Sequence, residues 1–311
     1  MKLMVYAVQF KGGSVQVIVA LLREFIKFAE IDYHVILSEE IKSQVNKFRF
    51  PKNFHFYDLP CKAGSNLLDL RKRNKFFKEI ENKIQPDCGL CSSGPLYHAT
   101  KFPLLMGYNL PHHIYRDSPY FKNNSFASKI RWFVRRVLHR YLYRHEASVC
   151  FVQTDDVNER LRKFIKKNNV VTISNTYNTA YNEPLKFPNK LPMKALNEVR
   201  MLTIAAYYPH KNLEIIKKVL KELWKRNIYN YKFVVTLTEE HYNKLFGEEY
   251  REHIYNVGFV PSIEGPSLYN ECDIMFLPTL LECFSASYAE AMIMGKPIIT
   301  SEMSFAHVVC K

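Results

Sequence analysis

Short apolar segments alternate with longer amphipathic ones along most of the chain. In the first half the short apolar segments predict buried strands at Val5–Val8, Tyr33–Leu37, Asn53–Leu59, Cys88–Cys91, Ser148–Val152 and Val170–Ser174. Between them, apolar residues recur at helical spacing and predict helices at Val15–Phe28, Leu67–Ile84, Ser125–Arg144 and Asp155–Lys166. Strands that alternate with helices predict a parallel sheet with helices on both faces.

A stretch with three prolines and no periodicity, residues 182–197, interrupts this alternation and is predicted to be a linker. The pattern then restarts with strands expected at Met201–Ala205, Phe233–Leu237, Tyr255–Val257, Ile274–Leu277 and Pro297–Thr300, and helices at Leu213–Trp224 and Ser285–Met294. The sequence therefore predicts an α/β protein with two Rossmann-like domains, residues 1–181 and 198–311. The two domains are expected to face each other across a cleft. Sheets of this kind bind ligands at the carboxyl ends of their strands.

The composition is that of a globular protein, with 47% hydrophobic and 24% charged residues in 311. No apolar run approaches the roughly 20 residues of a membrane-spanning helix. The apolar start of the chain, residues 1–7, is too short for a signal peptide, so we expect a cytoplasmic protein. Seven scattered cysteines do not form a disulfide framework, and the pair Cys88 and Cys91 is expected to be buried thiols.

The positive charge is concentrated in the first half of the chain. Residues 1–190 hold 31 lysines and arginines and 16 acidic residues, a net charge of +15, whereas residues 191–311 hold 13 and 14, a net charge of −1. This asymmetry predicts an anionic partner for the first half: a membrane surface, a phosphorylated substrate or a nucleic acid.

The helix expected at Ser125–Arg144 carries much of this charge. Its arginines are Arg131, Arg135, Arg136, Arg140 and Arg144, of which the last three share one face. Its apolar residues, among them Val134, Val137, Leu138 and Tyr141, lie on another face. A basic helix with an apolar face is typical of contact with an anionic membrane, and each cation there contributes about 1 kcal/mol. The alternative is a solvated helix that packs its apolar side on the sheet.

The segment that follows the strand ending near Pro278 has the chemistry of an anion site. Glu282 is expected in a loop, and Ser285 to cap a helix whose first N–H groups stay free to bind a pyrophosphate. Glu290 follows about one turn further in, where a carboxylate can accept hydrogen bonds from both hydroxyls of a ribose. The alternative is an ordinary helix with exposed carboxylates.

Glu282 and Glu290, followed by the sequence Gly-Lys-Pro at 295–297, resemble the motif of two glutamates separated by seven residues in the retaining GT-B glycosyltransferases of the fourth sequence family, glycosyl transferases group 1. The resemblance implies that Glu282 faces the donor sugar and that Glu290 binds the ribose of the nucleotide. It also implies that the backbone at Phe284 and Ser285 meets the diphosphate.

Further segments extend the resemblance. Lys211 matches a lysine that pairs with the donor phosphates, and an ammonium group suits the charge that develops on a leaving diphosphate. Ala206 stands where the family often has an arginine, so His210 or another cation would have to replace that charge. Gly258 matches the stretch that borders the nucleotide base. The pair at 12–13, Gly12 and Gly13, resembles the family's N-terminal glycine loop, beside the acceptor and the donor phosphates.

Two features of the resemblance are less well defined by the sequence. The family has a histidine in its first domain that faces the donor sugar, and we assign that role to His113, with a purely structural role for it and His112 as the alternative. The family continues with further strand and helix after the position that matches Lys311. We therefore expect the second domain to be truncated.

The resemblance predicts a hexosyl-type glycosyltransferase that uses a nucleotide diphosphate sugar and retains the configuration of the sugar. The acceptor would be a glycan or a lipid-linked molecule in polysaccharide or lipopolysaccharide synthesis, at the inner face of the membrane. We expect no metal and no other cofactor, because no Asp-x-Asp motif is present, and no nucleic-acid partner, because no such motif is found. Two alternatives remain: another GT-B enzyme, such as a nucleotide-sugar epimerase or a phosphorylase, and a non-enzymatic basic protein that binds nucleic acid.

Overall fold

The computed structural model describes residues 1–8, 13–62, 66–122 and 125–310. The chain divides into two compact units. The first unit contains Met1–Ile114 and Ser125–Ile173, and the second contains Tyr115–Asn124 and Ser174–Lys311. The second unit thus includes the proline-rich stretch and also a short segment from the middle of the first half of the chain.

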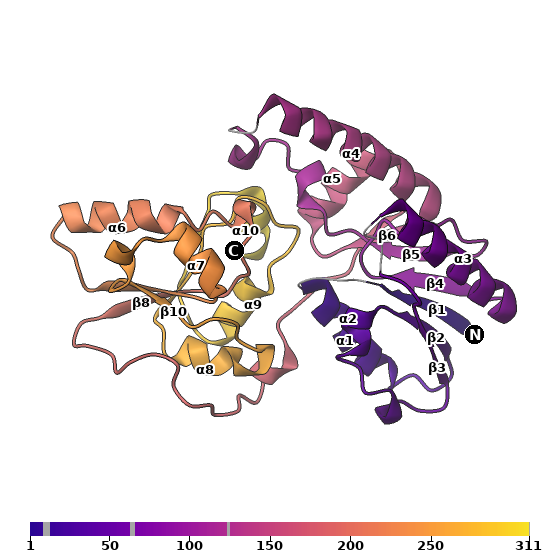
Figure 1. The fold of residues 1–311 in the computed structure, drawn as a ribbon, viewed down its shortest axis with the longest axis horizontal. Coiled ribbons are helices and arrows are strands. Elements are labelled where there is room, and N and C mark those ends of the chain that lie inside the picture. Colours follow the sequence, from indigo (N-terminus) through magenta and orange to yellow (C-terminus); the bar gives the residue numbers. More distant parts are fainter. Residues whose placement is uncertain (9–12, 63–65, 123–124, 311) are drawn as a thin grey trace. The chain divides into compact units, whose positions relative to one another are not determined.

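The first unit is built on one sheet in which all neighbouring strands are parallel (Figure 1). Its strands are β1 (Lys2–Ala7), β2 (Asp32–Leu37), β3 (Phe54–Asp58), β4 (Cys88–Cys91), β5 (Leu104–Gly107), β6 (Val149–Val152) and β7 (Val170–Thr172). They are arranged in the order β3-β2-β1-β4-β5-β6-β7. The chain therefore adds strands on one side of β1 first and then continues on the other side, from β4.

Helices cover both faces of this sheet. The side chains of β1 point alternately to one face and to the other, so each face has apolar residues for a helix to cover. The helices are α1 (Gly13–Phe25), α2 (Glu39–Lys42), α3 (Leu67–Ile84), α4 (Phe126–Glu146) and α5 (Asp155–Ile165). Val5 belongs to a buried cluster with Ile18 of α1. The next residue, Tyr6, points to the other face, where its ring lies 5.1 Å from that of Phe77 in α3.

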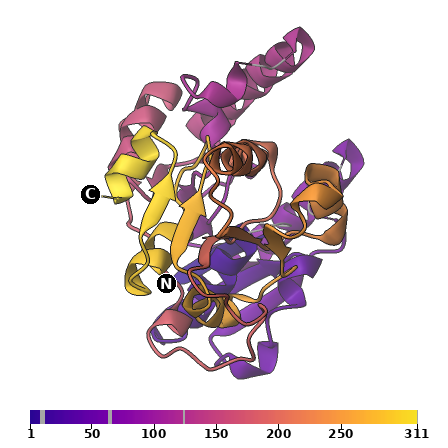
Figure 2. The ribbon, with the colours of Figure 1, turned by 90° about the vertical axis from the view of Figure 1, so that its left-hand side faces the viewer.

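The second unit contains a smaller sheet, again with parallel neighbours only. Its strands are β8 (Val199–Thr203), β9 (Tyr231–Val235), β10 (Ile254–Asn256), β11 (Ile274–Leu277) and β12 (Ile298–Thr300), in the order β10-β9-β8-β11-β12. The helices are α6 (Ile215–Lys225), α7 (Glu239–Leu245), α8 (Gly265–Asn270), α9 (Ala286–Ile293) and α10 (Ser304–Val309). Figure 2 shows β11 and β12 side by side in this unit. Phe233 and Phe276 meet in its core, with ring centroids 5.2 Å apart.

The predicted fold class, two parallel sheets flanked by helices, is confirmed. The structure adds β5, α2, α7, α8 and α10, which the sequence pattern does not predict. None of the described helices is long and apolar enough to cross a bilayer.

The segment Tyr115–Asn124 is tied to the second unit by buried contacts. Tyr115 is fully buried, and its ring meets that of Phe305 in α10 edge to face at 5.7 Å. His113, two residues earlier, belongs to the first unit. The chain therefore passes from one unit to the other directly after Ile114, although residues 112–120 contain no proline-rich linker.

Replacing Gly107 by alanine should destabilise the first unit by about 2 kcal/mol, because the new Cβ would lie 2.1 Å from the backbone oxygen of Ser92. Gly13→Ala is the matched control, since nothing lies within 4 Å of a Cβ at that position in α1. Urea denaturation of both variants measures the two free energies of unfolding. Equal stability of the two variants would contradict the close approach at Gly107.

Candidate functional site

The second sheet changes its direction of growth between β8 and β11. The chain passes from β8 outwards through β9 to β10 and then returns to form β11 on the opposite side of β8. In sheets of this type the loops after two such neighbouring strands separate and leave a crevice for a ligand. Here these loops are residues 204–212 and 278–285, and they carry four of the residues that the sequence predicts for the donor site: Lys211, Glu282, Phe284 and Ser285.

Lys211 and Glu282 come together at this point. Lys211 ends a short 3-10 helix, Pro209–Lys211, and its Nζ forms an ion pair with Oε1 of Glu282. Their side chains are only 16% and 11% exposed, so the pair is largely shielded from water. Asn212 follows in the left-handed conformation, with φ 55°, and its amide donates to the carbonyl of Pro278 at 3.2 Å. Two loops far apart in sequence are thereby held against each other.

Backbone hydrogen bonds strengthen this junction. The carbonyl of His210 accepts from the N–H of Leu280 at 2.8 Å and from the hydroxyl of Thr279 at 3.2 Å. Burial and the neighbouring charge of Lys211 lower the pKa of His210 to about 4. His210 is therefore neutral near pH 7 and does not replace the positive charge that the family often has at the position of Ala206.

Residues from the first half of the chain complete the junction, and the sequence analysis did not identify them. The hydroxyl of Ser118 donates to the carbonyl of Leu280 at 2.7 Å. The ring of Tyr120 stands edge-on to His210, with centroids 6.3 Å apart. No local pattern in the sequence shows that a segment so far upstream belongs to the second unit.

The start of α9 follows directly after Glu282. Ser285 occupies the expected N-cap position with an extended backbone, but its hydroxyl makes no capping hydrogen bond. The first N–H groups of the helix are therefore not bonded by a capping side chain. Together with the partial positive charge of the helix start, they can bind an anion. Ser285 is buried and Phe284 half-buried, so an anion there would be partly shielded from water.

Glu290 lies further along α9 and has an unusual environment for a carboxylate. It is half-buried, and burial raises its pKa to about 7, while a hydrogen bond with Tyr181 acts in the opposite direction. Tyr181 is buried, and its ring stands edge-on to that of Tyr269 at 6.0 Å. The sequence predicts Glu290 but not Tyr181, which stands at the end of the first predicted domain.

The glycines that the sequence predicts for the donor site lie in different parts of the chain. Gly258 has φ +69°, and nothing lies within 4 Å of a Cβ built on it, so the backbone there is open to a ligand. Gly13 is exposed at the start of α1 in the first unit. Gly12 lies outside the described residues.

His113 belongs to the interior of the first unit. It is 1% exposed, and its Nε2 lies 3.0 Å from Nδ1 of His139, whose other ring nitrogen bonds to the hydroxyl of Tyr97 at 2.7 Å. Burial, together with the charges of its neighbours, lowers the pKa of His113 to about 3, so the ring is neutral. This environment is that of a packed core histidine.

One group among the described residues has the donor set of a metal site. Asp32, His34 and His55 place their ligand atoms within 4.8 Å of one another, at the start of β2 and β3. Both histidines already bond to the carboxylate of Asp32, at 3.2 and 2.8 Å. None of these residues belongs to the predicted donor site.

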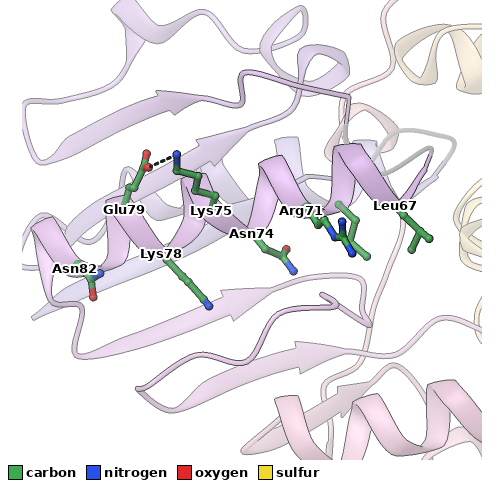
Figure 3. A pocket seen from close by; sticks show the side chains of 8 residues that line it. Leu67, Arg71, Asn74, Lys75, Lys78, Glu79 and Asn82 are labelled. Carbon is green, nitrogen blue, oxygen red and sulfur yellow. Dashed lines mark ion pairs between the residues drawn. The ribbon is translucent and has the colours of Figure 1, made fainter.

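Two surface cavities lie outside the predicted donor site. The larger, about 640 Å³, is shown in Figure 3. Every residue that lines it belongs to α3, including Arg71, Lys75 and Lys78. A cavity formed along one helix has no converging groups from a second element. A smaller one, about 320 Å³, lies along α4.

We expect Lys211→Met to lower the free energy of unfolding by about 2 kcal/mol, because it leaves the shielded carboxylate of Glu282 without its partner. The double variant Lys211→Met/Glu282→Gln should recover most of this loss. Urea denaturation of the wild type, both single variants and the double variant gives the coupling energy. Strictly additive effects would show that the two side chains do not interact.

The raised pKa of Glu290 predicts a pH dependence of stability. Between the ordinary pKa of about 4.5 and the folded pKa of about 7, the folded chain keeps a proton that the unfolded chain releases. Stability should therefore fall as the pH rises through this window, by about 1–2 kcal/mol given the partial exposure of Glu290.

Comparing the wild type with Glu290→Gln isolates this effect, because Glu146, with the same raised pKa of about 7, is unchanged in both proteins. The difference in free energy of unfolding, measured by urea titrations between pH 4.5 and 8, should change across the window. A constant difference would contradict the raised pKa of Glu290.

The chain resembles solved structures over nearly its whole length. HepE from Anabaena, in complex with UDP and glucose, shares 14% identity at a TM-score of 0.68, covering 99% of this chain and 82% of HepE. Sucrose-phosphate synthase from Thermosynechococcus elongatus shares 13% at 0.71, covering 98% and 82%. A UDP-N-acetylglucosamine 2-epimerase, described as putative, from Listeria monocytogenes shares 14% at 0.59, covering 98% and 80%. At these identities the likeness shows the fold, which is that of the GT-B proteins.

The family comparison concerns the second half of the chain. Residues 190–311 match the family model of glycosyl transferases group 1. No curated protein matches the sequence. The matched range contains Lys211, Gly258, Glu282, Phe284, Ser285 and Glu290. On a chain with the GT-B fold, the match of residues 190–311 to glycosyl transferases group 1 supports the enzyme class of the glycosyltransferases.

Proposed function

We propose that the protein transfers a sugar from a nucleotide diphosphate sugar to a glycan or lipid-linked acceptor, with retention of configuration. The observation that carries the proposal is the arrangement at the carboxyl ends of β8 and β11. There Lys211 is fixed by Glu282, the uncapped start of α9 follows, and Glu290 stands further along the same helix. A cation, the N–H donors of a helix start without a side-chain cap, and a carboxylate correspond to the diphosphate and the ribose of a nucleotide sugar.

The reaction breaks the bond between the anomeric carbon and the diphosphate oxygen, and forms one between that carbon and an acceptor hydroxyl oxygen. The hydroxyl proton passes to the leaving diphosphate, which gains negative charge as the old bond breaks. Groups that stabilise this charge where it develops lower the barrier.

Three side chains would have distinct tasks. Lys211 and the N–H groups at the start of α9 stabilise the leaving diphosphate. Glu282 holds Lys211 in place and orients the donor sugar. Glu290, as a carboxylate, accepts hydrogen bonds from the ribose, which contribute about 1.5–3 kcal/mol. The assignment of His113 to the donor sugar stays a prediction, and the residue is buried in the first unit.

Two other functions are alternatives to sugar transfer. The fold of the Listeria epimerase supports a nucleotide-sugar epimerase, which would convert the donor without any acceptor. The basic first half supports nucleic-acid binding, which would weaken steeply with salt. The match of residues 190–311 to glycosyl transferases group 1 favours transfer.

The proposed acceptor, a glycan or lipid-linked molecule, also suggests where the protein acts. We propose that the protein acts in polysaccharide or lipopolysaccharide synthesis, at the inner face of the membrane. The uneven charge, +15 over residues 1–190, suits an acceptor anchored in an anionic surface.

The first test is donor binding, followed by transfer. Calorimetry with uridine and guanosine diphosphate sugars should identify one nucleotide that binds. Glu290→Ala should weaken its binding by about tenfold or more, because the ribose hydroxyls lose their acceptor. Glu264→Ala is the control, a carboxylate of the same unit that pairs with Lys190 instead. Unchanged affinity of Glu290→Ala would contradict the ribose assignment.

With the donor known, the proton NMR spectrum of the product shows the anomeric configuration. Retention predicts that donor and product have the same configuration. Release of the nucleotide without acceptor, together with an epimerised sugar, would establish the epimerase instead.

A further inference from the structure

Two histidines and an aspartate gather where β2 and β3 begin, at one edge of the first sheet (Figure 1). His34 of β2 and His55 of β3 are direct neighbours in the register of these two parallel strands. Asp32 precedes His34 by two residues, and side chains two residues apart on a strand point to the same face. The backbone therefore brings one carboxylate and two imidazoles together on one face of the sheet. We call these three residues the edge cluster.

The edge cluster directs both imidazoles at the same carboxylate. Nε2 of His34 lies 3.2 Å from Oδ2 of Asp32, and Nε2 of His55 lies 2.8 Å from Oδ1. The two rings stack, with centroids 4.8 Å apart and 20° between their planes. No two of the three ligand atoms are more than 4.8 Å apart. Two ligand atoms of one tetrahedral zinc ion are about 3.3 Å apart, so a small movement of the exposed His55 completes the geometry.

The second ring nitrogen of His34 also has a partner. Its Nδ1 lies 3.0 Å from the hydroxyl of Tyr57, which stands two residues after His55 on β3. Metal-binding histidines usually have such a partner, which fixes the orientation and the tautomer of the ring. A hydroxyl can donate and accept, so Tyr57 can serve the neutral ring of His34 in either tautomer. The proton that leaves Nε2 when a metal binds there can therefore move to Nδ1.

The carboxylate of Asp32 keeps its negative charge for the edge cluster. Among the residues that the structure describes, its ion-pair partners are these two histidines alone. Lys2 stands beside Asp32 in the register of β1 and β2, but its ammonium group donates to the carbonyl of Ile84 at 3.0 Å. Neutral imidazoles leave the charge of Asp32 uncompensated, and a cation would compensate it. The side chains of Asp32 and His55 are 39% and 44% exposed, so an ion can enter from solvent.

We propose that Asp32, His34 and His55 bind a divalent transition-metal ion, for which zinc is the probe. Zinc takes imidazole nitrogen and carboxylate oxygen at about 2.0–2.2 Å, and a water on the exposed side would be its fourth ligand. The ion would fasten the edge strand β3 to β2 through their side chains. The proposal goes beyond sugar transfer. It departs from the expectation of no metal, which rests on the missing Asp-x-Asp motif.

Zinc binding to the full chain, without an affinity tag and freed of metal by dialysis against EDTA, tests the proposal. Calorimetry should show one zinc ion per chain. Zinc at about a hundred times its Kd should raise the melting temperature by roughly 5 °C. His55→Gln removes the exposed ligand and should weaken zinc binding by about tenfold or more. The matched control is His145→Gln, an exposed histidine of the same unit, which should bind zinc as the wild type does.

Two further measurements identify the ligands. Tyr57→Phe should weaken zinc binding by about tenfold or more, because it removes the partner that fixes the ring of His34. Cobalt in place of zinc should give the visible bands of a four- or five-coordinate ion, without the near-ultraviolet charge-transfer band of a cobalt–thiolate bond. Melting temperatures without metal show that the variants remain folded.

Three results would overturn the proposal. The first is a metal-free wild type that zinc neither binds nor stabilises. The second is a folded His55→Gln variant that binds zinc as tightly as the wild type. The third is a cobalt–thiolate band, which would assign the metal to the free cysteines of the chain. Calorimetry with nucleotide sugars tests residues of the second unit, so none of these results affects the proposed donor site.

Discussion

The ion pair between Lys211 and Glu282 joins two loops that leave neighbouring parallel strands, and the geometry of the candidate site depends on it. A parallel sheet that reverses its order must separate the loops at the reversal. Here the shielded charges, together with the bonds from Leu280 and Thr279 to the His210 carbonyl, bring them back into contact. The same pair fixes a cation next to the start of α9. One arrangement thus stabilises the second unit and, in the proposed function, holds a cation for the diphosphate.

Local patterns predict most of the elements that form this site. The apolar runs at β8 and β11 and the helix after Ser285 can be read from the sequence, because each is a regular element with clear ends. Local patterns do not predict β5, Leu104–Gly107, because this strand is short and has Pro103 before it and Pro111 shortly after it. Residues that reach the site by long-range packing, such as Ser118 and Tyr181, cannot be found in this way. Nothing in their immediate sequence specifies which unit they join.

The helix α4 shows a second limit of sequence patterns. Its amphipathic periodicity predicts a helix correctly, and the usual rule would place the apolar side inwards. In the structure the apolar side of α4 faces outwards instead, because its inner side makes buried polar contacts. Glu146 makes one of them. Tyr143 makes another, since its hydroxyl donates to the Gly107 carbonyl at 3.4 Å. Which side of a helix is buried is thus decided by the partners available to its polar groups, and those partners lie elsewhere in the chain.

The central claim is that the start of α9 and the loop at Lys211 bind the diphosphate of a nucleotide sugar. Hydrogen–deuterium exchange of the backbone amides, with and without a nucleotide sugar shown by calorimetry to bind, tests this most directly. The account predicts slower exchange in residues 284–288 and 210–212 when the donor is present, because the ligand covers those N–H groups. Unchanged exchange in these two segments, with slower exchange along α3 instead, would contradict it and place the donor in the cavity of that helix.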